Sequence, residues 1–218
     1  MVAAKHLLRY VKKTSHISLR LGPFITKDLY PVLDCHADWA GDVDRRKSSG
    51  GYVCVLSEDN PLREEPRQSA VSWSSKREPT VALSSTEAEY IALTQTTKEA
   101  IWVSRFIAEL QTVPITPTAK DATAEDPTTE DPTEESTLQK PATKIFVDNQ
   151  GVIALAHNPE FHARTKHIAI QEHYVREKVT TGEIEQEYLH TGNMIADCLT
   201  KNLSRDKVNR FRAEMGLH

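Results

Sequence analysis

The sequence predicts an α/β fold in which helices pack on a mixed β-sheet. Three apolar or alternating segments come first along the chain, at 31–37, 51–56 and 70–75, and polar turns separate them. A long amphipathic segment follows at 84–110, and short apolar segments then alternate with helical patterns to the C-terminus. A strand meander followed by such alternation is typical of a mixed sheet covered by helices.

The composition is ordinary for a globular protein and limits the function classes. The 218 residues are 39% hydrophobic and 27% charged, which suffices for one core. The net charge of −4 gives no global positive field for nucleic acid. The three cysteines, Cys35, Cys54 and Cys198, form no CxxC pair, which disfavours a zinc finger and favours a reducing compartment. No apolar run approaches the ~20 residues of a membrane span, and no signal peptide is recognisable. We therefore expect an intracellular protein that makes no membrane contact.

The first half of the chain is predicted to hold a helix, three strands and a second helix. Val2–Lys13 is a basic amphipathic helix whose basic face is either solvated or a nucleic-acid contact. The meander comprises strands at Pro31–Ala37, Gly51–Leu56 and Ala70–Ser75.

The second helix, Ser84–Leu110, is the strongest helical pattern in the chain. Ser84 and Glu87 form a capping box at its start. Its expected buried stripe consists of Ala88, Ile91, Ala92, Trp102, Phe106 and Leu110.

The second half begins with a compositionally foreign segment. Pro114–Pro141 is rich in proline, threonine and acids, so we expect a disordered insertion. Lys144–Asp148 is apolar enough to be a central strand. The remaining predictions are helices at Val152–His157, Thr165–Thr180 and Met194–Leu203, the last extended by the C-terminal tail, and a strand at Glu183–Leu189.

The first strand carries polar groups on one face. Asp34, His36 and Asp38 alternate with apolar residues, so they share one side of the strand. Asp148 ends the central strand, where α/β sheets place ligands, although an Asp there also caps a following helix. These positions indicate a metal-dependent site at the strand ends.

Two helical acids complete this candidate site. Glu89 lies beside the predicted buried stripe, whereas Glu87 is expected to face solvent. Asp197 lies in the first turn of a helix, where an acid also has a purely helical role. Carboxylates from several elements can hold two divalent metals about 3.5–4 Å apart, which is the requirement for phosphodiester hydrolysis.

Four motifs resemble one protein family. They are HADWAGDVDRRKSSGGYV, VSWSSKREPTVALSSTEAEYIALTQTTKEAIW, IFVDNQGVIALAHNPEFHARTKHI and IADCLTK. In this order they resemble the ribonuclease H domain of Ty1/copia-type retrotransposon polyproteins, and AAKHLLRYVKKT resembles the segment leading out of the reverse transcriptase. The resemblance implies a ribonuclease H-like fold with a five-stranded mixed sheet over residues 29–113 and 142–218, with 1–28 as a reverse transcriptase remnant and 114–141 as the insertion.

The resemblance also implies an activity, partners and site residues. The family cleaves the RNA strand of RNA–DNA hybrids with two Mg²⁺ or Mn²⁺ ions, as part of a polyprotein that acts in a cytoplasmic virus-like particle or the nucleus. Its second, third and fourth acids fall on Glu89, Asp148 and Asp197, and its first falls on His36. Asp38 is a further candidate metal ligand. The expected nucleic-acid contacts are Arg45, Arg46, Lys47, Ser48, Lys76, Arg77 and Lys166.

His36 is the departure from the family pattern. An imidazole that is neutral near pH 7 cannot bridge two Mg²⁺ ions as a carboxylate can. We therefore predict that cleavage is severely impaired or absent. The alternative functions are an inactive, hybrid-binding relic and, on the spacing of Asp148 and Glu183, a retroelement integrase, although that last function leaves the EAEY and ADCLTK motifs without a role.

Overall fold

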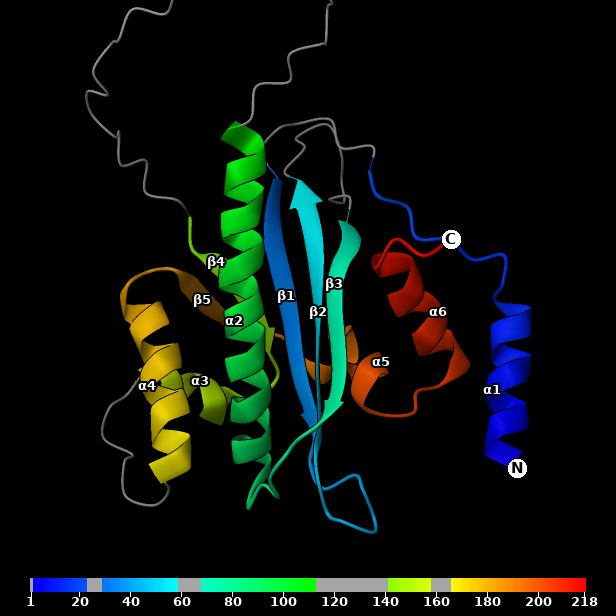
Figure 1. Ribbon diagram of the computed structural model, residues 1–218, viewed down its shortest axis with the longest axis horizontal. Coiled ribbons are helices and arrows are strands. Elements are labelled where there is room, and N and C mark those ends of the chain that lie inside the picture. Colours follow the sequence, from blue (N-terminus) through cyan, green and yellow to red (C-terminus); the bar gives the residue numbers. More distant parts are fainter. Residues whose placement is uncertain (1, 23–28, 59–67, 113–140, 158–165) are drawn as a thin grey trace, which may run out of the picture.

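The computed structural model describes residues 2–22, 29–58, 68–112, 141–157 and 166–218, and it contains a five-stranded sheet (Figure 1). The strand order is β3-β2-β1-β4-β5; β1, β2 and β3 pair antiparallel, whereas β1, β4 and β5 run parallel. The predicted five-stranded mixed sheet is thus confirmed. The strands are β1 (Leu29–Asp38), β2 (Ser49–Glu58), β3 (Gln68–Arg77), β4 (Thr143–Val147) and β5 (Ile184–Tyr188).

The register of the central strands positions the candidate site. His36 lies opposite Gly51 of β2, and Cys35 lies beside Val147, the last residue of β4. Asp148 therefore leaves the sheet next to His36. Because β1 and β4 are parallel, both residues lie at the same, C-terminal edge of the sheet, where α/β sheets hold ligands.

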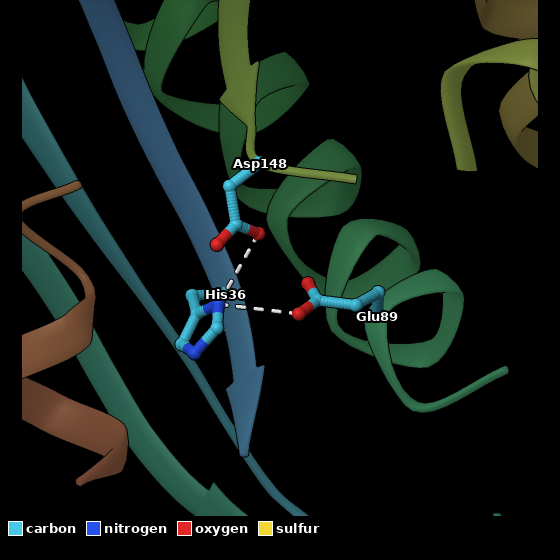
Figure 2. Close-up of side chains that lie close together, drawn as sticks. All are labelled: His36, Glu89 and Asp148. Carbon is cyan, nitrogen blue, oxygen red and sulfur yellow. Dashed lines mark hydrogen bonds and ion pairs between the residues drawn. The ribbon is translucent and has the colours of Figure 1, made fainter. Parts of the chain in front are cut away.

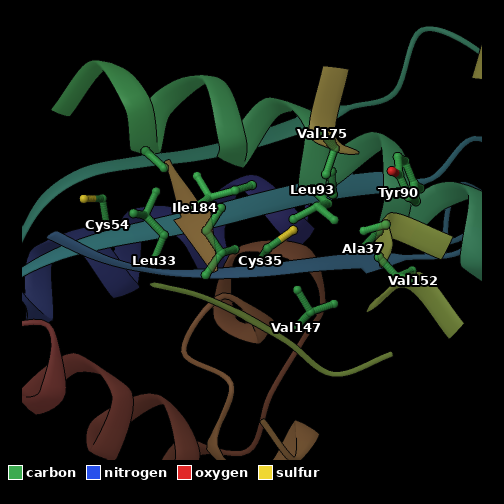
Figure 3. Packing of buried hydrophobic residues seen from close by; sticks show 14 of the residues in the cluster. Leu33, Cys35, Ala37, Cys54, Tyr90, Leu93, Val147, Val152, Val175 and Ile184 are labelled. Atoms are coloured by element: carbon green, nitrogen blue, oxygen red, sulfur yellow. The ribbon is translucent and has the colours of Figure 1, made fainter. Parts of the chain in front are cut away.

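Three helices cover one face of the sheet. They are α2 (Ser85–Thr112), α3 (Gln150–His157) and α4 (Lys166–Thr180). Alternate β1 residues, Leu33, Cys35 and Ala37, pack with apolar side chains of these helices in the larger core cluster (Figure 3).

At the start of α2, Ser84 Oγ accepts a hydrogen bond from the Glu87 backbone N–H at 3.1 Å. The Glu87 carboxylate accepts one from Leu83 N–H at 2.8 Å, so the pair does cap the helix.

The predicted orientation of α2 is wrong in its C-terminal half. Trp102, Phe106 and Leu110 are exposed by 60%, 46% and 56% and are not part of the core. The buried face instead runs through Glu89 and Ile107, because that face meets the sheet. Both sides of this half of the helix are apolar in sequence, so the pattern alone did not distinguish them. Glu87, expected in solvent, is buried while it caps the helix.

The other face of the sheet carries a smaller core and the C-terminal segments. These are a 3₁₀ turn η1 (Thr191–Asn193) and helices α5 (Asp197–Thr200) and α6 (Arg205–Glu214). The single helix predicted over 194–203 is therefore wrong. The backbone becomes extended at Lys201, and Ser204 then caps α6 by accepting a hydrogen bond from Lys207 N–H. Phe211 of α6 packs with Val32 and Val53 of the sheet.

The N-terminal helix α1 (Val2–Lys13) has the predicted bounds and stands apart from the sheet in Figure 1. Its apolar side chains Leu7, Leu8, Tyr10 and Val11 are all exposed. The predicted insertion Pro114–Pro141 lies, except for Pro141, outside the described residues. No helix in the described part of the chain is long and apolar enough to cross a membrane.

Candidate metal centre and nucleic-acid surface

Four of the predicted site residues meet at the C-terminal edge of the sheet, and we call them the His36 centre: His36, Glu89, Asp148 and Asp197. They come from β1, α2, the end of β4 and α5. His36 Nδ1 lies 3.1 Å from Glu89 Oε1 and 3.3 Å from Asp148 Oδ1 (Figure 2). Its other nitrogen, Nε2, lies 3.3 Å from Asp197 Oδ1. The ring thus stands among three carboxylates.

His36 is positively charged at neutral pH in the metal-free protein. Burial lowers its pKa, but hydrogen bonds to Asp148 and Glu89, together with their negative charges, raise it to about 9. The expectation of a neutral imidazole near pH 7 is therefore wrong for this state. The reason is that two acids from elements distant in sequence, Glu89 and Asp148, bond to the same ring nitrogen.

The pKa values of Glu89 and Asp148 are shifted in opposite directions, because burial raises a carboxyl pKa and contact with His36 lowers it. Burial raises the pKa of Glu89 although the His36 hydrogen bond and charge oppose it. Asp148 has a lowered pKa: burial alone would raise it, but the His36 bond and charge and a bond from Thr191 prevail. Thr191 Oγ1 donates that bond to Asp148 Oδ2 at 2.8 Å. Asp148 is thus better compensated than Glu89.

Asp197 is fully buried and is approached by a residue that sequence reasoning missed. Lys201 Nζ lies 3.0 Å from Asp197 Oδ1 and 3.4 Å from His36 Nε2. Lys201 is one helical turn after Asp197, so its i, i+4 spacing was the available signal. Asp197 Oδ2 is buried without a hydrogen-bond partner among the described residues. The centre therefore retains unsatisfied negative charge.

Asp34 and Asp38, which flank His36 on the strand, have other surroundings. Asp34 Oδ2 accepts a hydrogen bond of 2.7 Å from Ile195 N–H and so joins β1 to the segment before α5. Burial raises the pKa of Asp34 to about 7, in spite of that bond. Asp38 is half-buried, and its carboxylate lies against Gly41. The metal-ligand group among the described residues contains neither of them.

The residues present form a candidate metal-binding group but do not fit a pair of Mg²⁺ ions. His36, Glu89 and Asp148 each offer one ligand atom, and these atoms lie within 4.8 Å of one another. Two Mg²⁺ ions about 3.5–4 Å apart require carboxylate oxygens that both ions can share. The central position instead holds an imidazole whose two nitrogens already face three carboxylates.

Basic side chains line the same edge of the sheet. Arg45 and Arg46 are exposed in the β1–β2 turn, and Lys76 and Arg77 are exposed at the end of β3. Lys76 pairs with Gly50, one position from the Gly51 that lies opposite His36.

Arg77, although exposed, already pairs with Asp42 at 3.2 Å, and the remaining predicted contacts are engaged elsewhere or lie outside the described residues. Lys47 Nζ donates to Pro79 O at 2.6 Å. Ser48 is buried, and its Oγ accepts a hydrogen bond from Ala40 N–H, so it shapes the turn and is not exposed to a ligand. The Lys166 side chain lies outside the described residues.

The acid required by an integrase is far from the centre. Glu183 precedes β5, whereas Asp148 follows β4, and these parallel strands place the two residues at opposite edges of the sheet. Glu183 also pairs with Lys178 at 2.8 Å and Arg105 at 3.3 Å. The spacing in sequence therefore does not correspond to a shared site.

Among known proteins, this chain is similar in sequence to polyproteins of retrotransposons. The chain is 35% identical over 218 residues to the retrovirus-related Pol polyprotein from transposon TNT 1-94 of Nicotiana tabacum, covering 99% of this chain and 13% of the relative. It is 33% identical over 215 residues to the corresponding polyprotein from transposon RE1 of Arabidopsis thaliana, covering 99% and 12%. The chain thus spans a small part of these relatives' length.

The other comparisons are weaker. No protein-family model matches the chain. Among solved structures, the N-terminal RNase H domain of Rv2228c from Mycobacterium tuberculosis superposes with a TM-score of 0.43 at 9% identity, over 85% of this chain and 98% of that one.

Proposed function

Because the chain belongs to the family of Ty1/copia-type retrotransposon Pol polyproteins and has a ribonuclease H-like fold, we propose that it is the ribonuclease H domain of such a polyprotein. Its substrate is the RNA–DNA hybrid formed in reverse transcription. Its Mg²⁺-dependent cleavage of the RNA strand is severely reduced by His36.

One observation carries this proposal. The positions that match the family's four acids, distant in sequence, meet in one buried centre, and only the first of them has lost its carboxylate. Three buried acids are costly to fold unless a cation compensates them, so the centre keeps the character of a cation site. The residues present do not fit two Mg²⁺ ions. The two-ion chemistry of the family therefore requires an acid at position 36, where this chain has a histidine.

The exposed basic side chains support hybrid binding. Arg45, Arg46, Lys76 and Arg77 can contact phosphates while the centre faces the RNA strand. Such contacts do not depend on the residue at position 36. The hybrid-binding relic and the weak nuclease therefore differ only in residual cleavage, and binding should fall as salt rises in both.

Cleavage of a labelled RNA–DNA hybrid with Mg²⁺, and separately with Mn²⁺, tests the proposal. We expect His36→Asp to raise the Mg²⁺-dependent rate by a factor on the order of 100 or more, since it restores a shared carboxylate. His157→Asp is the matched control, because it makes the same exchange at an exposed histidine on α3 and should leave the rate unchanged.

A second variant identifies the source of any recovered activity. Glu89→Gln in the His36→Asp background should abolish the gain, because it removes another acid of the same centre. The proposal fails if the unaltered chain cleaves the hybrid at a rate that His36→Asp does not raise.

The reverse transcriptase of the same polyprotein is the proposed protein partner, and residues 1–28 the proposed connection to it. The exposed apolar side chains of α1 support a protein contact there. Leu7→Glu with Tyr10→Glu should leave the melting temperature of this chain unchanged and weaken its co-purification with that polymerase. Unchanged co-purification would reject the contact. With this partner, the domain would act in a cytoplasmic virus-like particle or the nucleus.

A further inference from the structure

The mismatch between His36 and a pair of Mg²⁺ ions points to a different metal preference. We propose that the His36 centre binds a single divalent cation of the Zn²⁺ or Co²⁺ class, with His36 Nδ1, Glu89 Oε1 and Asp148 Oδ1 as its ligands. This proposal rests on the proposed function, because it concerns the same centre, but it predicts binding and not cleavage.

The distances between the ligand atoms suit one ion. Metal–ligand bonds of about 2.1 Å place neighbouring ligand atoms roughly 3.0 Å apart in octahedral geometry and roughly 3.4 Å apart in tetrahedral geometry. His36 Nδ1 lies 3.1 Å from Glu89 Oε1 and 3.3 Å from Asp148 Oδ1. An ion can therefore replace the hydrogen on Nδ1 with little movement of the three side chains.

Asp197 completes the arrangement without being a ligand. Its Oδ1 lies 3.3 Å from His36 Nε2, so it can accept the N–H of the nitrogen that faces away from the ion. A carboxylate behind a metal-bound histidine fixes the ring orientation and makes the ring a better ligand. The buried Oδ2, which lacks a partner among the described residues, leaves the negative charge of Asp197 poorly compensated behind the ring.

The ligand type and the charge both favour one transition cation over two Mg²⁺ ions. Imidazole nitrogen suits Zn²⁺ and its neighbours in the first row, whereas Mg²⁺ prefers oxygen ligands only. With Nδ1 bound to metal, the three carboxylates carry three negative charges and Lys201 carries one positive charge. One divalent ion brings that sum to zero, and a second would leave an excess of positive charge in a buried site.

Metal titration of the purified full chain, first stripped with EDTA, tests the proposal. We expect calorimetry to show a Zn²⁺ site that His36→Gln weakens on the order of 10- to 100-fold and that binds Mg²⁺ far more weakly. Added Co²⁺ should give a visible d–d absorption that His36→Gln removes. His157→Gln, at an exposed histidine outside the centre, should retain both signals.

Two further measurements separate the roles of the residues. Asp197→Asn should weaken Zn²⁺ binding on the order of 10-fold while the bound ion keeps its imidazole ligand, as expected of a positioning residue. X-ray absorption at the zinc edge of the unaltered chain should show imidazole coordination, so the result does not depend on whether His36→Gln folds.

The outcomes for the two proposals are distinguishable. Zinc without an imidazole ligand, or Zn²⁺ and Co²⁺ affinities that are unchanged in a folded His36→Gln variant, would overturn the single-ion centre and leave the cleavage comparison untouched. Conversely, full Mg²⁺-dependent cleavage by the unaltered chain would overturn the proposed function even where zinc binds His36.

Discussion

Two clusters of charged side chains at opposite edges of the sheet differ in burial and in charge balance. At the start of β5, Glu183 pairs with Lys178 and Arg105, and Lys178 also pairs with Glu177, so two acids meet two cations. At the end of β1, three acids of the His36 centre share His36 and Lys201. The first cluster is balanced in charge, and the second has an excess of negative charge.

The two clusters also differ in burial, and this determines whether their charge balance has a functional consequence. The side chains of the His36 centre itself are at most 8% exposed, whereas Glu183 is 31% and Arg105 70% exposed. Water screens the Glu183 cluster, so its pairs contribute little to stability. The His36 centre is shielded from water, so its acids require a cation from the protein or from solution. A buried excess of acid therefore indicates a site, and a balanced exposed cluster does not.

The largest expected effect comes from removing the internal cation. His36→Leu leaves Glu89, Asp148 and Asp197 buried with only Lys201 to compensate them. We expect the free energy of unfolding in EDTA to fall by about 3–5 kcal/mol, measured by urea denaturation. A loss below about 1 kcal/mol, the size of an exposed pair, would show that the centre is no different from the Glu183 cluster.

His36→Asp should make stability depend on Mg²⁺. The variant gathers four buried acids that repel one another, and Mg²⁺ binds the folded state only. At a concentration of about 100 times its dissociation constant, the ion should stabilise the variant by about 2.7 kcal/mol. Thermal unfolding with and without Mg²⁺ measures this gain, and the unaltered chain should show almost none. An equal Mg²⁺ response in both chains would contradict the mismatch inferred for His36.

The excess of acid near the centre should also appear in the pH dependence of stability through Glu78. Burial raises its pKa from 4.5 to about 7, and the negative charges of Glu89 and Glu87 add to the effect. Because the folded state holds this proton more tightly than the unfolded state, the stabilisation is present below pH 4.5 and is lost as pH rises through 7.

The amide introduced by Glu78→Gln does not titrate, so the variant should not lose this stabilisation as pH rises through 7. At pH 8 we expect it to exceed the unaltered chain by about 2 kcal/mol in free energy of unfolding, and the advantage should vanish toward pH 4. Chemical denaturation across this range measures it, with Glu109→Gln as an exposed control on α2. A difference that does not change with pH would contradict the raised pKa.

The sequence predicted most elements because their periodicity is local information. β1 extends only two residues before and one after its predicted range, and α1 has the predicted bounds. The buried stripe predicted for the C-terminal half of α2 is wrong because Trp102 and Phe106 are as apolar as the residues that face the sheet. Which side is buried depends on the partner elements, and these come from distant parts of the chain.

The site residues were predictable as identities but not as an electrostatic unit. The motifs named His36, Glu89, Asp148 and Asp197, and the fold brings them together. The raised pKa of His36 depends on the carboxylates of Glu89 in α2 and of Asp148 after β4, which no local pattern contains. Lys201 carried only the weak signal of its spacing from Asp197, so its approach to the His36 ring was not foreseen.

The smallest expected loss of stability is at the Glu183 cluster. It is the reference against which the larger losses expected at the His36 centre are judged. Lys178, with smaller help from Arg105, lowers the pKa of the Glu183 carboxyl, and Glu183→Gln removes the carboxylate that these cations stabilise. Because Arg105 and Glu183 remain accessible to water, we expect a loss below about 1 kcal/mol that shrinks as salt rises. Urea denaturation at low and high salt measures it. A loss of several kcal/mol that persists at high salt would mean that exposure does not separate the two clusters, and burial would then not distinguish a metal site from a surface cluster.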